Sequence, residues 1–125
     1  MTSTPTPTNI KLHKKSKTLE LIYGQDSYEL SAEFLRVHSP SAEVRGHGIG
    51  NGTLQTGKKF VGIKGVEAVG NYALKIIFDD GHDSGLFTWN YLHDLAIQHD
   101  QYWDKYLQSL KEEGESRDEG LIGKF

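Results

Sequence analysis

The clearest pattern in the chain is an alternation of apolar and polar positions over residues 72–78. One face of this segment carries Tyr72, Leu74, Ile76 and Phe78, and the other carries Ala73, Lys75 and Ile77. A period of two predicts a β-strand with one face on the core and the other partly in water. Turn signals at residues 70–71 and 79–81 separate it from apolar segments at residues 60–69 and 83–87, which predicts an antiparallel meander.

The spacing of apolar residues changes to three and four after Thr88, whose side chain is suited to cap a helix N-terminus. The positions that follow this spacing are Trp89, Leu92, Leu95, Ala96, Trp103, Tyr106, Leu107 and Leu110. They predict one continuous helix from Trp89 to about Leu110, which at about 1.5 Å per residue is about 33 Å long. A rod of that length is expected to lie across one face of the sheet.

The N-terminal half begins with a predicted hairpin. Residues 19–23 and 27–30 have the pattern of two strands around a tight turn at residues 24–26, and Ser31 then caps a short helix over residues 32–37. We therefore predict an α+β fold. It consists of an antiparallel β-sheet of about five strands, made of the N-terminal hairpin and the C-terminal meander, packed by one long C-terminal helix, with a short helix after the first hairpin.

A length of 125 residues suits one domain. Residues 1–17, rich in Thr, Pro and Lys, are predicted to be a disordered basic tail, and residues 111–125 an acidic flexible tail, which leaves a single domain over residues 18–110. Five glycines fall between residues 46 and 57, where no apolar period survives. We expect a long exposed loop at residues 38–53, which includes most of the glycine-rich stretch 46–57. Loops of this length are often functional, and a flexible connection is the other interpretation.

The net charge of −3 is unevenly distributed, because residues 1–17 carry +4, residues 111–125 carry −2 and residues 18–110 carry −5. An acidic body argues against a nucleic-acid partner, since phosphate binding needs a clustered basic face. The lysines of the first segment suit contact with RNA or anionic lipid, and a solvating tail explains them as well. With no cysteine, no membrane-spanning apolar segment and no apolar core of a signal peptide, a cytoplasmic protein without a membrane partner is expected.

Two segments carry a family resemblance. Residues 81–92 have the sequence GHDSGLFTWNYL, and residues 34–44 have the sequence FLRVHSPSAEV. In this order and spacing, the chain resembles the gamma-butyrobetaine hydroxylase-like N-terminal domain family over about residues 18–107, in its stand-alone bacterial form, long catalogued as a domain of unknown function. In the hydroxylases of this family the domain precedes a 2-oxoglutarate oxygenase domain, and in bacteria it also occurs fused to iron–sulfur carrier ATPases.

The resemblance also implies where a metal would lie. The hydroxylase domain binds its metal through three cysteines in a C-x-C-x-x-C loop after the first helix and one histidine in the later hairpin. His82 falls at the position of that histidine, but the cysteine loop corresponds to Ser39–Val44, which holds no sulfur. Because serine hydroxyls are poor zinc ligands near neutral pH, we expect the inherited zinc site to be absent.

His82 and His47 form an alternative candidate site. His47 lies in the loop that the family places beside the hairpin of His82, with Glu43 and His38 nearby in sequence. Imidazoles and a carboxylate suit weak binding of iron or zinc, and protonated imidazoles suit a phosphorylated or carboxylated ligand. A plain hairpin turn, in which Asp and Gly serve the backbone, is the other interpretation of His82.

No arrangement of residues in the sequence predicts catalysis. There is no cysteine nucleophile, no G-x-S-x-G sequence, and no histidine followed two residues later by Asp or Glu for an oxygenase iron site. We therefore expect no enzyme but a non-catalytic interaction or adapter module linked to iron or iron–sulfur metabolism, whose partner is an iron–sulfur carrier or a larger enzyme. The alternative is a metal-binding protein that uses His47 and His82 for iron or zinc.

Overall fold

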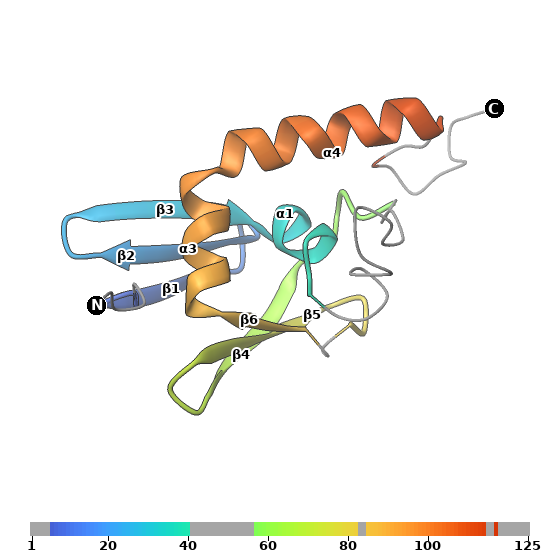
Figure 1. The fold of residues 1–125 in the computed structure, drawn as a ribbon. Coiled ribbons are helices and arrows are strands. Elements are labelled where there is room, and N and C mark those ends of the chain that lie inside the picture. The colour runs from blue at the N-terminus through green and yellow to red at the C-terminus, as the bar shows by residue number, and fades with distance from the viewer. Residues whose placement is uncertain (1–5, 41–56, 83–84, 115–116, 118–125) are drawn as a thin grey trace.

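Two three-stranded antiparallel sheets and several helices make up the described part of the computed structural model, residues 6–40, 57–82, 85–114 and 117 (Figure 1). The strands of the first sheet are, in spatial order, β1 (Asn9–His13), β2 (Thr18–Tyr23) and β3 (Asp26–Ser31). Those of the second are β4 (Ile63–Val69), β5 (Ala73–Phe78) and β6 (Leu86–Thr88). The α+β class is confirmed, whereas the prediction of one sheet with about five strands is wrong.

Strand β1 forms inside the segment that was predicted to be a disordered basic tail, residues 1–17. Ile10 and Leu12 alternate with polar residues, pair with two leucines of β2 and pack against the buried core. Burial of this apolar face offsets the entropy cost of ordering a lysine-rich segment, so the predicted tail is wrong over Asn9–His13. Residues 1–5 lie outside the described residues.

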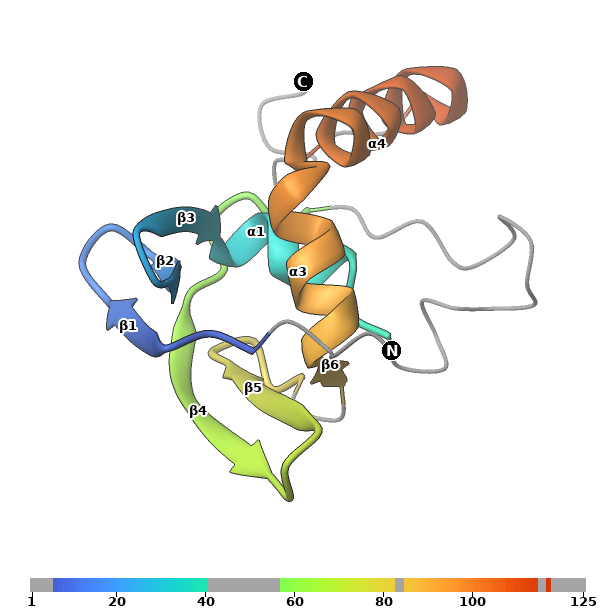
Figure 2. The ribbon, with the colours of Figure 1, turned by 60° about the vertical axis from the view of Figure 1, so that its left-hand side comes forward.

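Strands of both sheets turn their apolar faces toward one shared core. The alternating pattern is therefore the same in both sheets and does not show that there are two. Alternation identifies strands with an apolar face but does not say which strands pair. Helix α3 (Trp89–Ile97) contacts β3 of the first sheet and β6 of the second, and Figure 2 shows it beside both sheets. The buried residues of this core include Leu19, Leu21, Leu30, Phe34, Leu35, Ile63, Leu74, Ile76, Phe78, Phe87, Leu92 and Leu95.

Both predicted helix starts are confirmed. Ser31 caps α1 (Ala32–Val37), and its Oγ accepts a hydrogen bond from the Phe34 N–H at 3.0 Å. Thr88 caps α3 in the same way, accepting from the Tyr91 N–H at 3.2 Å. In each case a hydroxyl satisfies a backbone donor that the first turn of a helix leaves unpaired.

The predicted single C-terminal helix is wrong, because the helix breaks at Gln98 into α3 and α4 (His99–Glu113) (Figure 1). Gln98 has φ −105° and ψ 29°, and its side-chain amide donates to the Asp94 carboxylate at 3.0 Å. Tyr102, beyond the break, also donates its hydroxyl hydrogen to Asp94. The spacing of three and four continues across the break and so did not reveal it. Among the described residues, no helix has the length and apolar character needed to cross a bilayer.

Helix α4 packs on α1 instead of lying across a sheet. The buried cluster between them consists of Val37, Tyr106 and Leu110. Beyond α4, the Arg117 guanidinium donates two hydrogen bonds of 2.8 Å to the buried carboxylate of Glu33 in α1. The predicted flexible tail over residues 111–125 is therefore wrong up to Glu113 and at Arg117, and its remaining residues other than Gly114 lie outside the described ones.

His38 follows α1 inside a cluster of aromatic rings. Its ring centroid lies 4.6 Å from that of Phe34 and 5.3 Å from that of Tyr102, and its Nδ1–H donates to the Phe34 carbonyl at 2.8 Å. Burial lowers the pKa of His38, because the charged imidazolium is poorly solvated there. The bond to Phe34 opposes this effect, whereas nearby His99 adds to it. His38 is therefore neutral in the folded protein at neutral pH.

The contribution of β1 can be tested with Leu12→Ala. This variant should lower the free energy of unfolding by roughly 1–3 kcal/mol, less than truncation of a fully buried leucine, because Leu12 is partly buried. Lys11→Ala, on the exposed face of the same strand, should change it by less than about 0.5 kcal/mol. Urea denaturation followed by circular dichroism measures both. Equally small effects would show that β1 does not support the fold.

The burial of His38 should make the protein less stable in acid. Its pKa in the folded state is lower than in the unfolded chain, about 6.5, so the unfolded state binds the proton first as the pH falls. The stability that depends on neutral His38 is complete above about pH 6.5 and is lost as the pH falls through the folded-state pKa. His38→Gln should reduce the slope of unfolding free energy against pH between about pH 7 and pH 5. Urea denaturation measures that slope, and an unchanged slope would contradict this assignment.

Candidate functional site

Three segments that are far apart in sequence meet at the carboxylate of Asp80. Asp80 follows β5, Arg36 belongs to α1, and Lys58 precedes β4. The Oδ2 atom of Asp80 is 2.9 Å from Arg36 Nε and 3.2 Å from Lys58 Nζ, and its Oδ1 accepts the His82 N–H at 3.1 Å. The turn that carries His82 is thereby fixed to α1 and to the start of β4.

Burial alone would raise the pKa of the Asp80 carboxyl. The hydrogen bonds from the His82 amide, Arg36 and Lys58, together with the charge of Arg36, outweigh burial and hold this pKa below its usual range. Asp80 is therefore a carboxylate at neutral pH and is paired with two cations. It organises the turn and does not hold a proton that a general acid would donate.

His82, the predicted metal ligand, contacts the first residue of the loop that lacks cysteine. Its Nε2 is 2.9 Å from the Oγ of Ser39, and Ser39 is fully buried. A Cβ atom at Gly85 would lie 2.0 Å from the same Oγ, so the hydroxyl needs a glycine at that position. The start of the loop and His82 are thus joined by a hydrogen bond, where the family resemblance implies a sulfur ligand and a metal.

The Ser39–His82 pair fits neither a structural zinc ion nor a catalytic nucleophile. A serine hydroxyl is not ionised near neutral pH, so the pair lacks the donor set of a tightly held zinc. A serine beside a histidine can act as a nucleophile when a substrate reaches it. Ser39 has no exposed surface and Gly85 packs against its hydroxyl, which keeps a substrate away in this conformation.

The prediction that His47 and His82 share a metal is not tested by the described residues. His47, Glu43 and residues 46–56 of the glycine loop lie outside the described residues. His38 is held among aromatic rings, with its Nδ1 bonded to a backbone carbonyl. Metal binding by His47 and His82 therefore stays a prediction.

A basic surface beside this site was not predicted from the sequence. Phe60 is 61% exposed, and the ammonium groups of Lys17 and Lys59 lie 6.0 and 5.5 Å from its ring centroid. Lys17 also donates to the Phe60 carbonyl at 2.9 Å, which joins the β1–β2 turn to the segment before β4. We call this surface the lysine corner. Its members are Lys17, Lys59 and Phe60, and Lys58 adjoins it in sequence.

The sequence signal for the lysine corner was divided between two distant segments. The sequence pattern predicts a tail for the lysines of residues 11–17 and the start of a strand for residues 58–60. Lys17 and Phe60 are 43 residues apart, and the contact arises because pairing of β1 with β2 orders the turn between them. A pattern that is local in sequence contains no information about such a contact.

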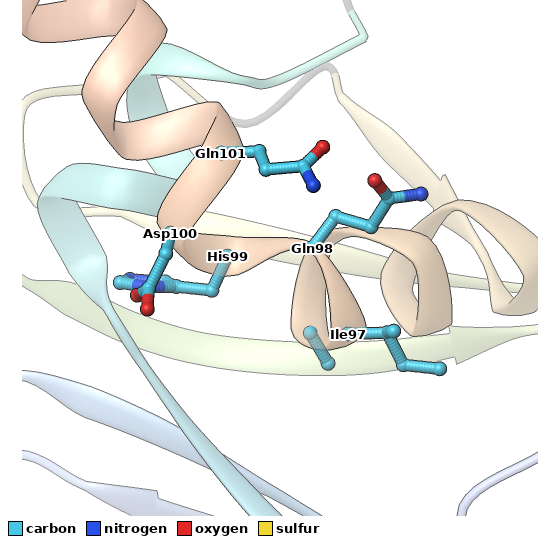
Figure 3. Close-up of a pocket in the computed structure, with 6 residues that line it drawn as sticks. Ile97, Gln98, His99, Asp100 and Gln101 are labelled. Carbon is cyan, nitrogen blue, oxygen red and sulfur yellow. The ribbon is translucent and has the colours of Figure 1, made fainter.

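A hollow at the break between α3 and α4 is a separate feature, lined by residues 96–101. Figure 3 shows the side chains of Gln98 and Gln101 on one side of the break and those of His99 and Asp100 on the other. All the described residues that line it are neighbours in sequence, so none of them comes from a segment that is distant in the chain. We attribute the hollow to the bend itself.

Comparison with known proteins identifies the family of the chain. Residues 10–93 match the family described as gamma-butyrobetaine hydroxylase-like, N-terminal. Two NMR solution structures are similar to the chain. One is 60% identical, with a TM-score of 0.83 and 98% of each chain covered. The other is 45% identical, with a TM-score of 0.79 over 100% of this chain and 98% of that chain.

A third similar structure is the crystal structure of a protein with unknown function in the DUF971 family, from Acidithiobacillus ferrooxidans ATCC 23270. It is 32% identical, with a TM-score of 0.62 over 77% of this chain and 98% of that chain. No curated protein matches the chain. The family match covers most of the folded residues and confirms the resemblance seen in the sequence. The chain belongs to the gamma-butyrobetaine hydroxylase-like N-terminal domain family.

Proposed function

We propose that the protein is a non-catalytic interaction module whose lysine corner docks an acidic segment of a partner protein. The observation that supports it most directly is the exposed ring of Phe60, which has the ammonium groups of both Lys17 and Lys59 close to it. A ring in contact with cations presents an apolar surface and positive charge to the same partner. An apolar side chain flanked by carboxylates complements both properties.

The charge distribution supports an acidic partner. Residues 1–17 and 57–60 hold six lysines and no acidic residue, although the whole chain has a net charge of −3. Asp80 offsets part of this positive charge, since it pairs with Lys58. A positive surface on an acidic protein orients an approaching acidic partner, and salt screens the attraction.

The backbone beneath Phe60 is already fixed, which lowers the entropy cost of binding. The Phe60 carbonyl accepts a hydrogen bond from Lys17, Val61 is buried, and the Gly62 N–H donates to the Asp79 carboxylate at 2.9 Å. Lys17 itself has a φ of 59°, a conformation that is uncommon for a residue other than glycine. Such backbone strain is concentrated at functional positions, which adds support to this surface.

A protein partner is favoured over a nucleic acid. Residues 18–110 carry a charge of −5, which repels a phosphate backbone that extends beyond the lysine corner. Binding of a single nucleic-acid strand uses successive aromatic rings along a basic groove, and the lysine corner has one ring. Fusion of family members to iron–sulfur carrier ATPases motivates an iron–sulfur carrier or a larger enzyme as the partner.

Phe60→Ala tests this proposal. The probe is a fluorescein-labelled peptide with glutamates around one leucine, and fluorescence anisotropy measures its binding. We expect Phe60→Ala and Lys17→Asn each to weaken binding about tenfold, or about 1.4 kcal/mol, because each removes one half of the ring–cation surface. Asparagine suits the positive φ of residue 17, so the backbone should not change. Tyr72→Ala removes an aromatic residue of similar exposure, 55%, outside the lysine corner and should have no effect.

Equal binding of the acidic peptide to all variants would contradict the proposal. So would binding of single-stranded DNA with the same dependence on Phe60 and Lys17, because nucleic acid would then be the ligand. Added salt should weaken the wild-type interaction. Affinity purification from the native cell, compared between wild type and Phe60→Ala, then identifies the partner.

The second candidate function is weak binding of iron or zinc by His82 and His47. It is supported by the contact of His82 with Ser39, because Ser39 begins the loop that carries His47. The described residues do not fit a structural zinc, so folding should not depend on this metal.

Removal of metal should leave the melting temperature unchanged, because the sheets and helices form their core without it. Differential scanning fluorimetry before and after chelation measures this. Elemental analysis of protein purified without a tag measures bound iron and zinc, and His82→Ala tests whether the metal is held at this position. A large fall in melting temperature would instead identify a structural metal site, and metal content that His82→Ala does not change would remove this candidate.

A further inference from the structure

The exposed face of the first sheet brings three metal-ligating side chains together. His13 of β1, Glu20 of β2 and Glu29 of β3 offer ligand atoms that all lie within 4.8 Å of one another. His13 Nε2 is 2.9 Å from Glu20 Oε1 and 3.8 Å from Glu29 Oε2. The three strands are neighbours in one sheet, so a hydrogen-bonded framework positions all three side chains.

These separations match those between ligands of a tetrahedral zinc ion. Zinc binds imidazole nitrogen at about 2.0–2.1 Å and carboxylate oxygen at about 2.0–2.2 Å, so two ligand atoms lie about 3.3–3.5 Å apart. The two distances from His13 Nε2 bracket that value. Small rotations of the side chains would therefore replace the hydrogen bond between His13 and Glu20 with a shared ion.

The arrangement of charge also favours a cation. Glu20 and Glu29 are direct cross-strand partners, and two carboxylates in that position repel each other unless positive charge lies between them. Lys11, opposite Glu20 on β1, offsets part of this repulsion. A divalent ion held by both carboxylates and His13 would offset more of it.

A hydroxyl group outside the cluster holds one of the two carboxylates. Thr18 Oγ1 donates to Glu29 Oε2 at 3.2 Å. Ser16 in turn hydrogen-bonds to Thr18 at 3.1 Å. Hydrogen bonds of this kind orient the ligands of metal sites and raise their affinity.

We propose that His13, Glu20 and Glu29 form a binding site for a first-row divalent transition-metal ion, with zinc as the probe. One imidazole and two carboxylates leave a position for water, which is typical of zinc sites that do not hold a fold together. This site uses β1, β2 and β3, whereas His82 lies in the turn after β5. It is therefore independent of the second candidate function and of docking at the lysine corner.

Isothermal titration of the metal-free full chain with zinc chloride tests this proposal. We expect saturable zinc binding, and we expect His13→Ala and Glu29→Gln each to weaken it about tenfold or more, because each removes a ligand. Thr18→Val keeps all three ligands and should weaken binding by a smaller factor. His93→Ala is the matched control and should keep the wild-type affinity, because His93 packs against the ring of Tyr23 and belongs to neither candidate metal site. Circular dichroism checks that each variant folds, and NMR of the His13 imidazole nitrogens reports whether Nε2 binds the metal.

Three results would overturn the proposal: no saturable zinc binding by the wild type, unchanged affinity in His13→Ala, or loss of binding in His82→Ala with retention in His13→Ala. The proposed docking function can fail separately. If the acidic peptide does not bind while His13→Ala weakens zinc binding, the docking function is contradicted and the metal site is supported.

Discussion

Shared burial of two small sheets against α3 is the interaction on which the rest of the structure depends. Each sheet has three short strands, of three to seven residues, and cannot enclose a core alone. Leu92 and Leu95 of α3 are fully buried in the common core, and burial of such a side chain stabilises a fold by roughly 1.5–3 kcal/mol. Helix α1 and the turn after β5 both border this core. Arg36 of the helix therefore lies close enough to pair with Asp80 of the turn.

Local chemistry predicted local structure well. Ser31 and Thr88 begin their helices as expected, because an N-cap needs only a hydroxyl and the next three residues. The break at Gln98 was missed because the apolar spacing is the same on both sides of it. Strand β1 was not predicted, because the segment is rich in Thr, Pro and Lys and contains only two alternating apolar residues, Ile10 and Leu12. Their burial depends on pairing with β2.

The candidate site was predictable in part. The position of His82 followed from the family resemblance, but its contact with buried Ser39 depends on packing of α1 against the β5–β6 turn. The sequence also gave no reason to join Lys17 with Phe60, or His13 with Glu29, because these contacts require the pairing of β1 with β2. Because β1 was not predicted from the sequence, neither the lysine corner nor the cluster of His13, Glu20 and Glu29 could be predicted.

The ion pair between Arg117 and Glu33 closes a loop in the chain. From α1 the backbone passes through the second sheet, α3 and α4, and it then returns to α1 through two hydrogen bonds. The Arg117 carbonyl also accepts the Lys59 N–H at 2.9 Å. Helix α4 is therefore connected to the rest of the fold at both of its ends. The helix it packs on, α1, leads at its C-terminal end into Ser39, so a partner bound to α4 would be linked through α1 to the contact between Ser39 and His82.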